Sequence, residues 1–262
     1  MPSSALHVAR TGLEAQDTRM RVIANNLANI GTTGFKRDRA NFATLAYQDA
    51  RVAGQQSSSE TAYATGLNLG TGVGILSTTS ITTQGTLSAT GNALDLALDG
   101  DGYFQVQLPG GRLGYTRAGN FTRSAEGLLV TSQGYALQPP ITIPEGASAI
   151  TVAADGTVSV NGAGGAGPTE IGQITIAAFA NPAGLQALGD NFLAETAASG
   201  AAQVGAAGEG GRGSLRQGML EASNVNVVEE LVDMIECQRA YEINSKMISA
   251  VDEMLKNANQ TL

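Results

Sequence analysis

The chain has 262 residues, a net charge of −8 and 15% charged residues, with 34 glycines and no tryptophan. An acidic balance without basic runs argues against nucleic acid as a partner. No apolar stretch reaches the ~18 residues of a membrane-spanning helix, so no insertion into a lipid bilayer is expected.

The N-terminal residues 4–30 are predicted to form a long amphipathic helix. Ser3 and Ser4 are candidate N-caps, and Gly31 marks the end of the pattern. A seven-residue repeat on a helix indicates a left-handed supercoil with a partner. An ordinary core helix is the alternative. The repeat positions are Leu6, Leu13, Met20 and Leu27, with Ala9, Ile23 and Ile30 on a second seam that Gln16 interrupts.

The middle of the chain has the texture of short β-strands. Residues 46–65 are polar and without a clear period, so by themselves they indicate a linker. From residue 66 on, apolar runs alternate with Gly-containing turns, which predicts an antiparallel sandwich or barrel. The expected strands are 72–83, 93–98, 103–108, 127–131, 141–144, 150–152, 157–160 and 171–179. The Gly/Ala-rich residues 197–213 are expected to form a mobile loop.

The C-terminal residues 227–258 are predicted to form a second long helix. Asn226, with Glu229 three residues later, resembles a capping box. One apolar stripe repeats every seven residues, and a second lies on another face, which suggests more than one neighbour; a wide core-facing stripe in a monomer is the alternative. The first stripe is Val227, Met234, Tyr241, Ile248 and Leu255, with Leu231 beside it, and the second is Ile243, Met247, Val251 and Met254.

Charge differs between the two ends. Residues 1–40 hold six Lys/Arg and three Asp/Glu (+3), and residues 221–262 hold three and eight (−5). Opposite charge favours pairing between the two helices over pairing of each with itself, although exposed ion pairs contribute only about 0.2–1 kcal/mol each.

No residues form a recognisable catalytic or metal site. His7 is the only histidine, so a multi-histidine metal site is impossible. Asp99 and Asp101 are interpreted as turn residues, because Gly110 stands where a calcium loop needs its bidentate carboxylate. The single Cys237 excludes an intramolecular disulfide and is expected to be buried. We expect no enzyme and no cofactor; a secreted cell-wall glycosidase, or a β-rich adhesin with helical tails, is the alternative.

Four motifs carry a family resemblance over essentially the whole chain. The run ANNLANIGTTGFKR at 24–37 resembles the N-terminal motif of flagellar rod and hook proteins. SNVNV at 223–227, with the residues after it through 246, resembles their C-terminal motif, and DGDGYFQV (99–106) and YTRAGNF (115–121) resemble their central β motifs. Length favours a rod member over a hook member, with the distal rod ahead of the proximal rod.

The resemblance implies an α+β fold in three parts. Residues 1–30 and 226–262 would form a coaxial, coiled-coil-like inner domain, residues 31–72 and 214–225 a connecting region, and residues 73–213 an antiparallel β-rich outer domain. Within the connecting region, the resemblance changes the interpretation of residues 46–65 from a linker to an ordered, rod-type contact between subunits.

The implied function is a structural, axial protein that polymerises into a straight hollow rod, transmits torque and forms part of the export channel. The implied partners are further copies of the chain, the proximal-rod proteins, the hook protein, the L and P rings, and transiently the rod cap and export apparatus. The implied location is the basal body across the periplasm, reached without a cleaved signal peptide.

The expected assembly residues come from both helices, and a group of polar and glycine residues ends the first one. Gly31 and Gly34 would allow the chain to turn out of the inner layer, and the amides of Asn25, Asn26 and Asn29 would bond neighbouring backbones or simply end the helix. The assembly residues are Leu6, Leu13, Met20, Ile23, Leu27, Val227, Leu231, Met234, Tyr241, Ile248 and Leu255.

Overall fold

The structure, a computed structural model, describes residues 2–56, 62–147, 149–162 and 168–260. The chain forms two compact units. The helix unit comprises Met1–Leu27, Asp38–Thr79 and Asn226–Leu262, and the β unit comprises Ala28–Arg37 and Ser80–Val225. Within this division, residues 38–72 group with the helices, and residues 31–37 and 214–225 group with the β-strands. The three-part domain organisation stays a prediction.

Two long helices dominate the helix unit: α1 (Pro2–Ala28) and α2 (Val227–Gln260). Helix α1 already includes Ser3 and Ser4, so the prediction that they cap it was wrong. The N-cap of α2 was predicted correctly, because Asn226 Oδ1 accepts the Val228 N–H at 3.1 Å. Helix α1 ends at Ala28, before Gly31, in a turn in which Thr32 N–H donates to Asn29 O.

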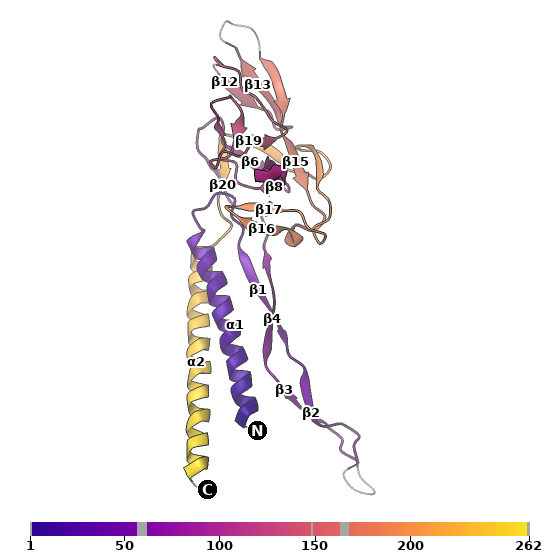
Figure 1. Cartoon of the computed structure of the whole chain (residues 1–262), viewed down its shortest axis with the longest axis vertical. Helices are drawn as coiled ribbons and strands as arrows, with labels where there is room; N and C mark the ends of the chain where they lie inside the picture. The colour runs from indigo at the N-terminus through magenta and orange to yellow at the C-terminus, as the bar shows by residue number, and fades with distance from the viewer. Residues whose placement is uncertain (1, 57–61, 148, 163–167, 261–262) are drawn as a thin grey trace. The chain divides into compact units, whose positions relative to one another are not determined.

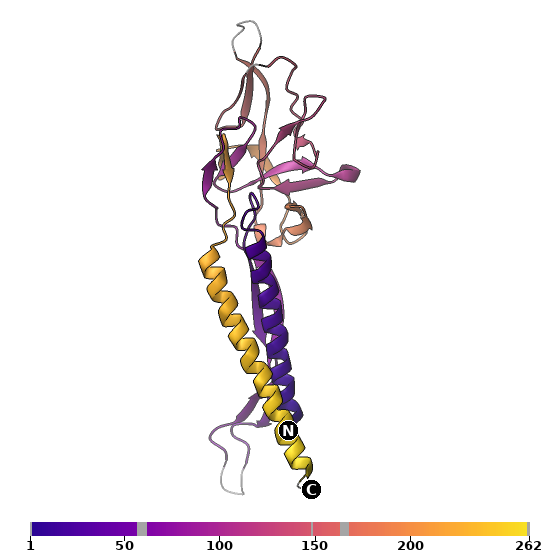
Figure 2. The ribbon, with the colours of Figure 1, turned by 90° about the vertical axis from the view of Figure 1, so that its left-hand side faces the viewer.

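The two helices lie side by side and run in opposite directions (Figures 1 and 2). Their contacts pair rising numbers in α1 with falling numbers in α2: Gly12 lies against Asn244, Gln16 against Cys237, and Asn26 against Glu230. The α+β class and the pairing of the two terminal helices therefore agree with the sequence analysis, while the supercoil stays a prediction.

A two-stranded ribbon completes the helix unit. Strand β1 (Asp38–Thr44) pairs with β4 (Val73–Ser80), and the chain between them forms a second pair, β2 (Tyr47–Arg51) with β3 (Leu67–Gly70). The part of the predicted 46–65 linker at residues 47–51 is thus a strand. Residues 57–61 of that stretch lie outside the described residues.

The β unit is built around one large antiparallel sheet with order β16-β17-β8-β7-β15-β18, and β11 also pairs with β7. A three-stranded sheet, β12-β13-β14, and three two-stranded pairs, β19-β6, β20-β5 and β10-β9, surround it. The strands of the large sheet are β16 (Gln186–Gly189), β17 (Phe192–Ala194), β8 (Leu113–Thr116), β7 (Tyr103–Gln107), β15 (Thr175–Ala178), β18 (Gln203–Ala206) and β11 (Leu137–Gln138). The others are β5 (Leu87–Ala89), β6 (Leu96–Asp99), β9 (Thr122–Arg123), β10 (Leu129–Val130), β12 (Ala149–Val152), β13 (Thr157–Asn161), β14 (Thr169–Gln173), β19 (Ser214–Gln217) and β20 (Met219–Glu221).

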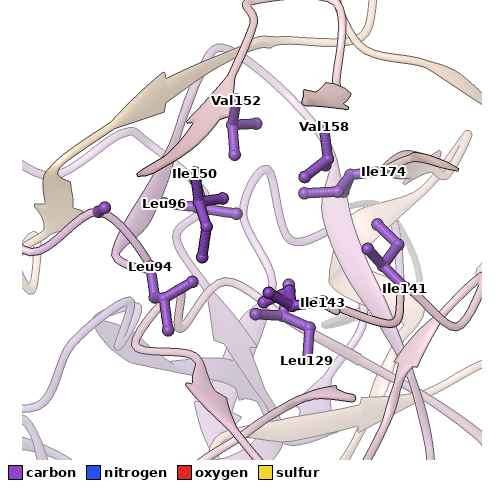
Figure 3. Close-up of a pocket in the computed structure, with 10 residues that line it drawn as sticks. Leu94, Leu96, Leu129, Ile141, Ile143, Ile150, Val152, Val158 and Ile174 are labelled. Atoms are coloured by element: carbon purple, nitrogen blue, oxygen red, sulfur yellow. The ribbon is translucent and has the colours of Figure 1, made fainter. Parts of the chain in front are cut away.

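The core of the β unit is aliphatic, with Phe104 and Phe121 packed edge to face at 5.1 Å between ring centroids. A gap within this core is lined only by aliphatic side chains and leaves about 10 Å³ of free space (Figure 3). A site of this size without polar groups stays dry, so we interpret it as a packing gap and not as a ligand site.

Two strand predictions and one loop prediction need correction. Residues 171–179 are not one strand, because they hold the end of β14 and all of β15, which belong to different sheets. Residues 141–144 form an isolated bridge, Thr142 with Leu128, and not a full strand. The prolines at 140 and 144 on either side lack the N–H groups that a longer ladder uses, and Ile141 and Ile143 point into the core. Residues 197–213 are not one loop, because β18 lies within them and pairs with β15. Of the two expected turn residues, Asp101 lies in the bend at Gly100–Asp101 between β6 and β7, whereas Asp99 is the last residue of β6 and its carboxylate pairs with Arg216 at 2.8 Å.

Candidate assembly interface

The seam between α1 and α2 is made of small and polar side chains. On α1 it buries Ala9, Ala15, Ile23 and Asn26, and on α2 the buried positions repeat at seven residues. These α2 positions are Glu230, Cys237, the half-buried Asn244 and Val251. The small side chains let the two helices approach closely, and the polar ones must find partners across the seam.

Polar contacts run along this seam. Arg19 Nη2 donates to Asp233 Oδ1 at 2.9 Å, and the Cys237 thiol donates to Gln16 O at 3.1 Å. Near the end of α1, Asn26 Nδ2 donates to both carboxylate oxygens of Glu230 at 3.3 Å. Because each contact fits one alignment of the helices only, the polar seam sets their register.

The large apolar residues expected at the assembly interface lie mostly beside this seam. Ile23 is buried, and Val227, Leu231 and Tyr241 are exposed. The side chain of Leu255 lies outside the described residues. The half-buried members are Leu6, Leu13, Met20, Leu27, Met234 and Ile248. The contact within one chain therefore uses mainly positions next to the stripe that the sequence emphasised, and it leaves Val227, Leu231 and Tyr241 exposed.

Helix α2 also exposes further large apolar side chains on its outer faces. Val228 is 68% exposed, and Val232 and Ile235 follow it on the same side at helical spacing. Ile243, Met247 and Met254 of the second predicted stripe are exposed as well. An apolar surface of this extent on one helix is typical of a protein–protein interface.

The reactivity of the buried Cys237 thiol measures how well the seam between α1 and α2 is closed. Burial raises the pKa of its thiol above the ordinary value of 9.0, so the unreactive thiol form persists at neutral pH. We expect iodoacetamide to alkylate the native chain more than about tenfold more slowly than the urea-unfolded chain, the factor given by an opening free energy of about 1.4 kcal/mol. Mass spectrometry of samples quenched at successive times measures the two alkylation rates.

The same shift fixes the pH dependence of the seam. The raised pKa contributes stability that is complete below pH 9.0 and is lost as pH rises through the folded value. A Cys237→Ala chain should lack this alkaline loss. Equal alkylation rates in native and unfolded chains would show that the thiol is not shielded.

The motif asparagines at the end of α1 have different environments. Asn26 is 1% exposed, and its amide pairs with both backbone groups of Asp38: Nδ2 donates to the carbonyl and Oδ1 accepts the N–H, each at 2.9 Å. Asn29 Oδ1 accepts the Thr32 hydroxyl at 3.1 Å, and Asn25 is exposed. A bond from Asn26 to a neighbouring backbone is thus present, within the same chain.

The segment after α1 is held by the segment before α2. Gly34 N–H donates to Glu221 O at 2.8 Å, and Arg37 N–H donates to Asn224 Oδ1 at 2.7 Å. Asn224 Nδ2 in turn donates to Ile81 O at 2.8 Å. We call residues 28–37, 81–85 and 221–225 the neck. All three segments belong to the β unit.

A buried ion cluster lies at the neck. The Glu221 carboxylate accepts Lys36 Nζ at 2.6 Å, Arg117 Nη1 at 3.2 Å and the Gly85 N–H at 2.9 Å. All three charged side chains are at least nine-tenths buried. Burial lowers the pKa of the Lys36 ammonium, and the Glu221 carboxylate opposes that shift. Sequence reasoning missed Glu221, although Lys36 and Arg117 each lie in a recognised motif.

The two neck glycines differ in what they require. Gly34 has a φ of +70°, and a Cβ there would stand 2.7 Å from the Arg117 carbonyl carbon, whereas a Cβ at Gly31 would meet nothing within 4 Å. We expect Gly34→Ala to lower the free energy of unfolding by about 2–4 kcal/mol, from left-handed strain and overpacking together. Gly31→Ala should change it by less than about 1 kcal/mol. Urea unfolding of both variants measures this, and equal losses would contradict it.

The described part of the chain holds no group of three His, Cys, Asp or Glu side chains placed to bind a metal ion. None of its helices is long and apolar enough to cross a membrane.

Three family models match the chain in order. They are flagella basal body rod protein at residues 6–36, flagellar hook protein FlgE/F/G D1 domain at 97–160, and flagellar basal body rod FlgEFG protein C-terminal at 216–261. The chain is 50% identical to the flagellar basal-body rod protein FlgG of Buchnera aphidicola from Acyrthosiphon pisum, over 98% of both chains. The chain belongs to the FlgG family of flagellar basal-body rod proteins.

A comparison with two proteins of Caulobacter vibrioides distinguishes the FlgG group from the FlgF group. The chain is 49% identical to FlgG of that bacterium over 98% of both chains, and 34% identical to its FlgF over 99% of this chain and 98% of the relative. Because both relatives come from one bacterium, the difference in identity assigns the chain to the FlgG group and not to the FlgF group. The family is one of structural flagellar rod proteins and not of enzymes, so the glycosidase alternative is not favoured.

Proposed function

We propose that the chain polymerises into the straight, hollow distal rod, which carries torque to the hook and forms part of the export channel. The observation that carries this proposal is that the positions buried between α1 and α2 are not the apolar stripe that the sequence predicts for assembly. Within one chain the seam uses small and polar residues, while the predicted assembly residues Val227, Leu231 and Tyr241 stay exposed. A second copy of the chain is the partner that would cover them.

The proposal gives the assembly residues two roles. Ile23 stabilises the helix pair of its own subunit, and the other assembly residues contact neighbouring subunits. Contacts of this heterologous kind do not close on themselves and so generate a helical tube, with the helices as a coaxial, coiled-coil-like inner layer. The β-rich unit would form the outer layer, with residues 46–65 as a rod-type contact between subunits.

The neighbours in this proposal are the proximal-rod proteins, the hook protein and the L and P rings, with the rod cap and export apparatus as transient partners. The rod would span the periplasm, and its subunits would be exported without a cleaved signal peptide.

Electron microscopy of the concentrated full-length chain, beside a chain lacking residues 1–30 and 227–262, tests the proposal. Straight hollow tubes from the full-length chain alone are the expected result. Curved tubes would instead support a hook-type polymer. Persistent monomers, in the presence of preformed rod ends as templates, would overturn the polymer hypothesis.

A further inference from the structure

The ribbon of the helix unit is attached to α1 at both of its ends. At one end, the Asn26 amide pairs with Asp38, the first residue of β1. At the other, Thr11 Oγ1 accepts the Val73 N–H at 3.3 Å, where β4 begins and where Leu45 N–H donates to Gly72 O.

The spacing of these two attachments matches on both elements. Fifteen residues separate Thr11 from Asn26, which is about 22 Å of helix at 1.5 Å per residue. Strand β1 has 7 residues, which is about 23 Å of strand at 3.3 Å per residue. The equal lengths allow the ribbon to follow α1 over the full length of β1, and Figure 1 shows β1 and β4 running beside α1.

The turn at Thr11 is closely fitted. Gly72 has a φ of +118°, and a Cβ on it would collide with Thr11 Oγ1. Thr11 is itself buried. The attachment of the ribbon at Thr11 is therefore mainly steric, with one long hydrogen bond from the Val73 N–H.

The attachment at Asn26 differs, because it also involves α2. One Nδ2 hydrogen is donated to Asp38 O, and the other points at the Glu230 carboxylate. Asn26 and Glu230 are each 1% exposed, so no water competes for these groups. A primary amide provides this set, one acceptor for a backbone N–H and two donors for two different acceptors, and of the two side chains that carry one, asparagine is the shorter.

We propose that Asn26 is a positioning residue that couples pairing of α1 with α2 to the alignment of the β1–β4 ribbon on α1. Docking of Glu230 orients and shields the amide, and the oriented amide fixes Asp38 and hence the register of β1. The consequence for assembly rests on the proposed function: a subunit presents its paired strands β2 and β3 in a fixed position only when its two long helices have paired.

Asn26→Asp is the direct test, because it keeps the shape of the side chain and replaces both donors by an acceptor. The introduced carboxylate would face the Asp38 carbonyl and the Glu230 carboxylate. Asn25→Asp is the matched control, with the same charge change at an exposed neighbouring position of the same helix end. Glu230→Gln in the Asn26→Asp background supplies a donor toward the introduced carboxylate and reverses the polarity of the α1–α2 contact.

Two readouts follow the two sides of the amide, measured on the full chain in solution and in sedimented assemblies. Hydrogen exchange of the Asp38–Thr44 amides reports the ribbon, and iodoacetamide alkylation of Cys237 reports the helix pair. In Asn26→Asp both rates should rise by at least about tenfold, as expected on losing a hydrogen bond to a charged group. In Asn25→Asp both should stay as in the wild type.

The double variant separates coupling from general damage. Its Cys237 alkylation should return toward the wild-type rate, while exchange in β1 stays raised, because the introduced carboxylate still faces the Asp38 carbonyl. Equal behaviour of Asn25→Asp and Asn26→Asp, or a wild-type chain without protection at β1 in either form, would overturn the proposal. Tube formation by the wild type is scored separately, so failure of the polymer function is distinguishable from failure of this coupling.

Discussion

Replacing Glu221 by glutamine should lower the free energy of unfolding by about 3–5 kcal/mol, the typical loss when one member of a buried ion pair is removed. Glu221 is the only carboxylate that the described contacts give to both buried cations, Lys36 and Arg117. Without it, both charges remain buried, and the carboxylate no longer opposes the desolvation of Lys36.

Urea unfolding of the Glu221→Gln chain measures this loss. Glu145→Gln is the control, because Glu145 is an exposed carboxylate of the same unit. Adding Lys36→Met to Glu221→Gln should recover part of the loss, since one of the two uncompensated charges then disappears. Equal stabilities of the Glu145 and Glu221 variants would contradict the assignment of this cluster as a structural element of the neck.

The pH dependence gives a second signature. In the Glu221→Gln chain, the pKa of Lys36 falls further below its ordinary 10.5, because the opposing carboxylate is gone. A lysine whose folded pKa is depressed adds stability as pH rises from that folded value toward 10.5. The variant should therefore regain part of its stability at alkaline pH, and the Lys36→Met double variant should not.

The second large effect is expected at Leu231. This side chain is 43% exposed and lies on the stripe that the intrachain seam leaves open. Leu231→Asp should leave the unfolding free energy within about 0.5 kcal/mol of the wild type, as for other surface changes. It should abolish tube formation, because a charge at the buried centre of an interface leaves an unpaired group out of water.

Three substitutions at Leu231 separate the effect of an introduced charge on tube formation from the effect of losing an apolar side chain. Leu231→Met keeps an apolar side chain and should assemble, and Leu231→Asn removes apolarity without charge. Electron microscopy and sedimentation of each chain, and rod formation in cells, measure the outcome. Leu27→Asp and Met234→Asp are expected to permit export and to prevent incorporation in the same way. Normal rods from Leu231→Asp or Met234→Asp chains would show that these residues are not part of the interface between subunits.

The sequence predicted the existence of both helices and the start of α2, but not which stripe α1 and α2 share. Periodicity identified Leu231 and Tyr241 correctly as members of an apolar stripe, yet an apolar stripe does not say which partner covers it. The seam positions Glu230, which is buried, and Asn244, which is half-buried, are polar, so a hydrophobic pattern could not indicate them.

Other features depend on contacts that no local pattern carries. Strand Tyr47–Arg51 is exposed and mostly polar, so it lacks the alternation that marks a half-buried strand. The Glu221 cluster joins residues more than eighty positions apart, and only the fold brings them together. By contrast, the turn at Asp101 and the burial of Cys237 follow from local chemistry, and both were predicted.

The polar seam also bears on how the chain comes to be folded. Helix α2 follows α1 after an interval of about 200 residues, which takes about 10–40 s to synthesise at 5–20 residues per second. For that time the nascent α1 has no companion, and a strongly apolar inner face on it would favour misassociation. Because its inner surface is mostly alanine, glycine and hydrogen-bonding groups, it gains little from random encounters, and that surface is covered only when α2 is aligned with it.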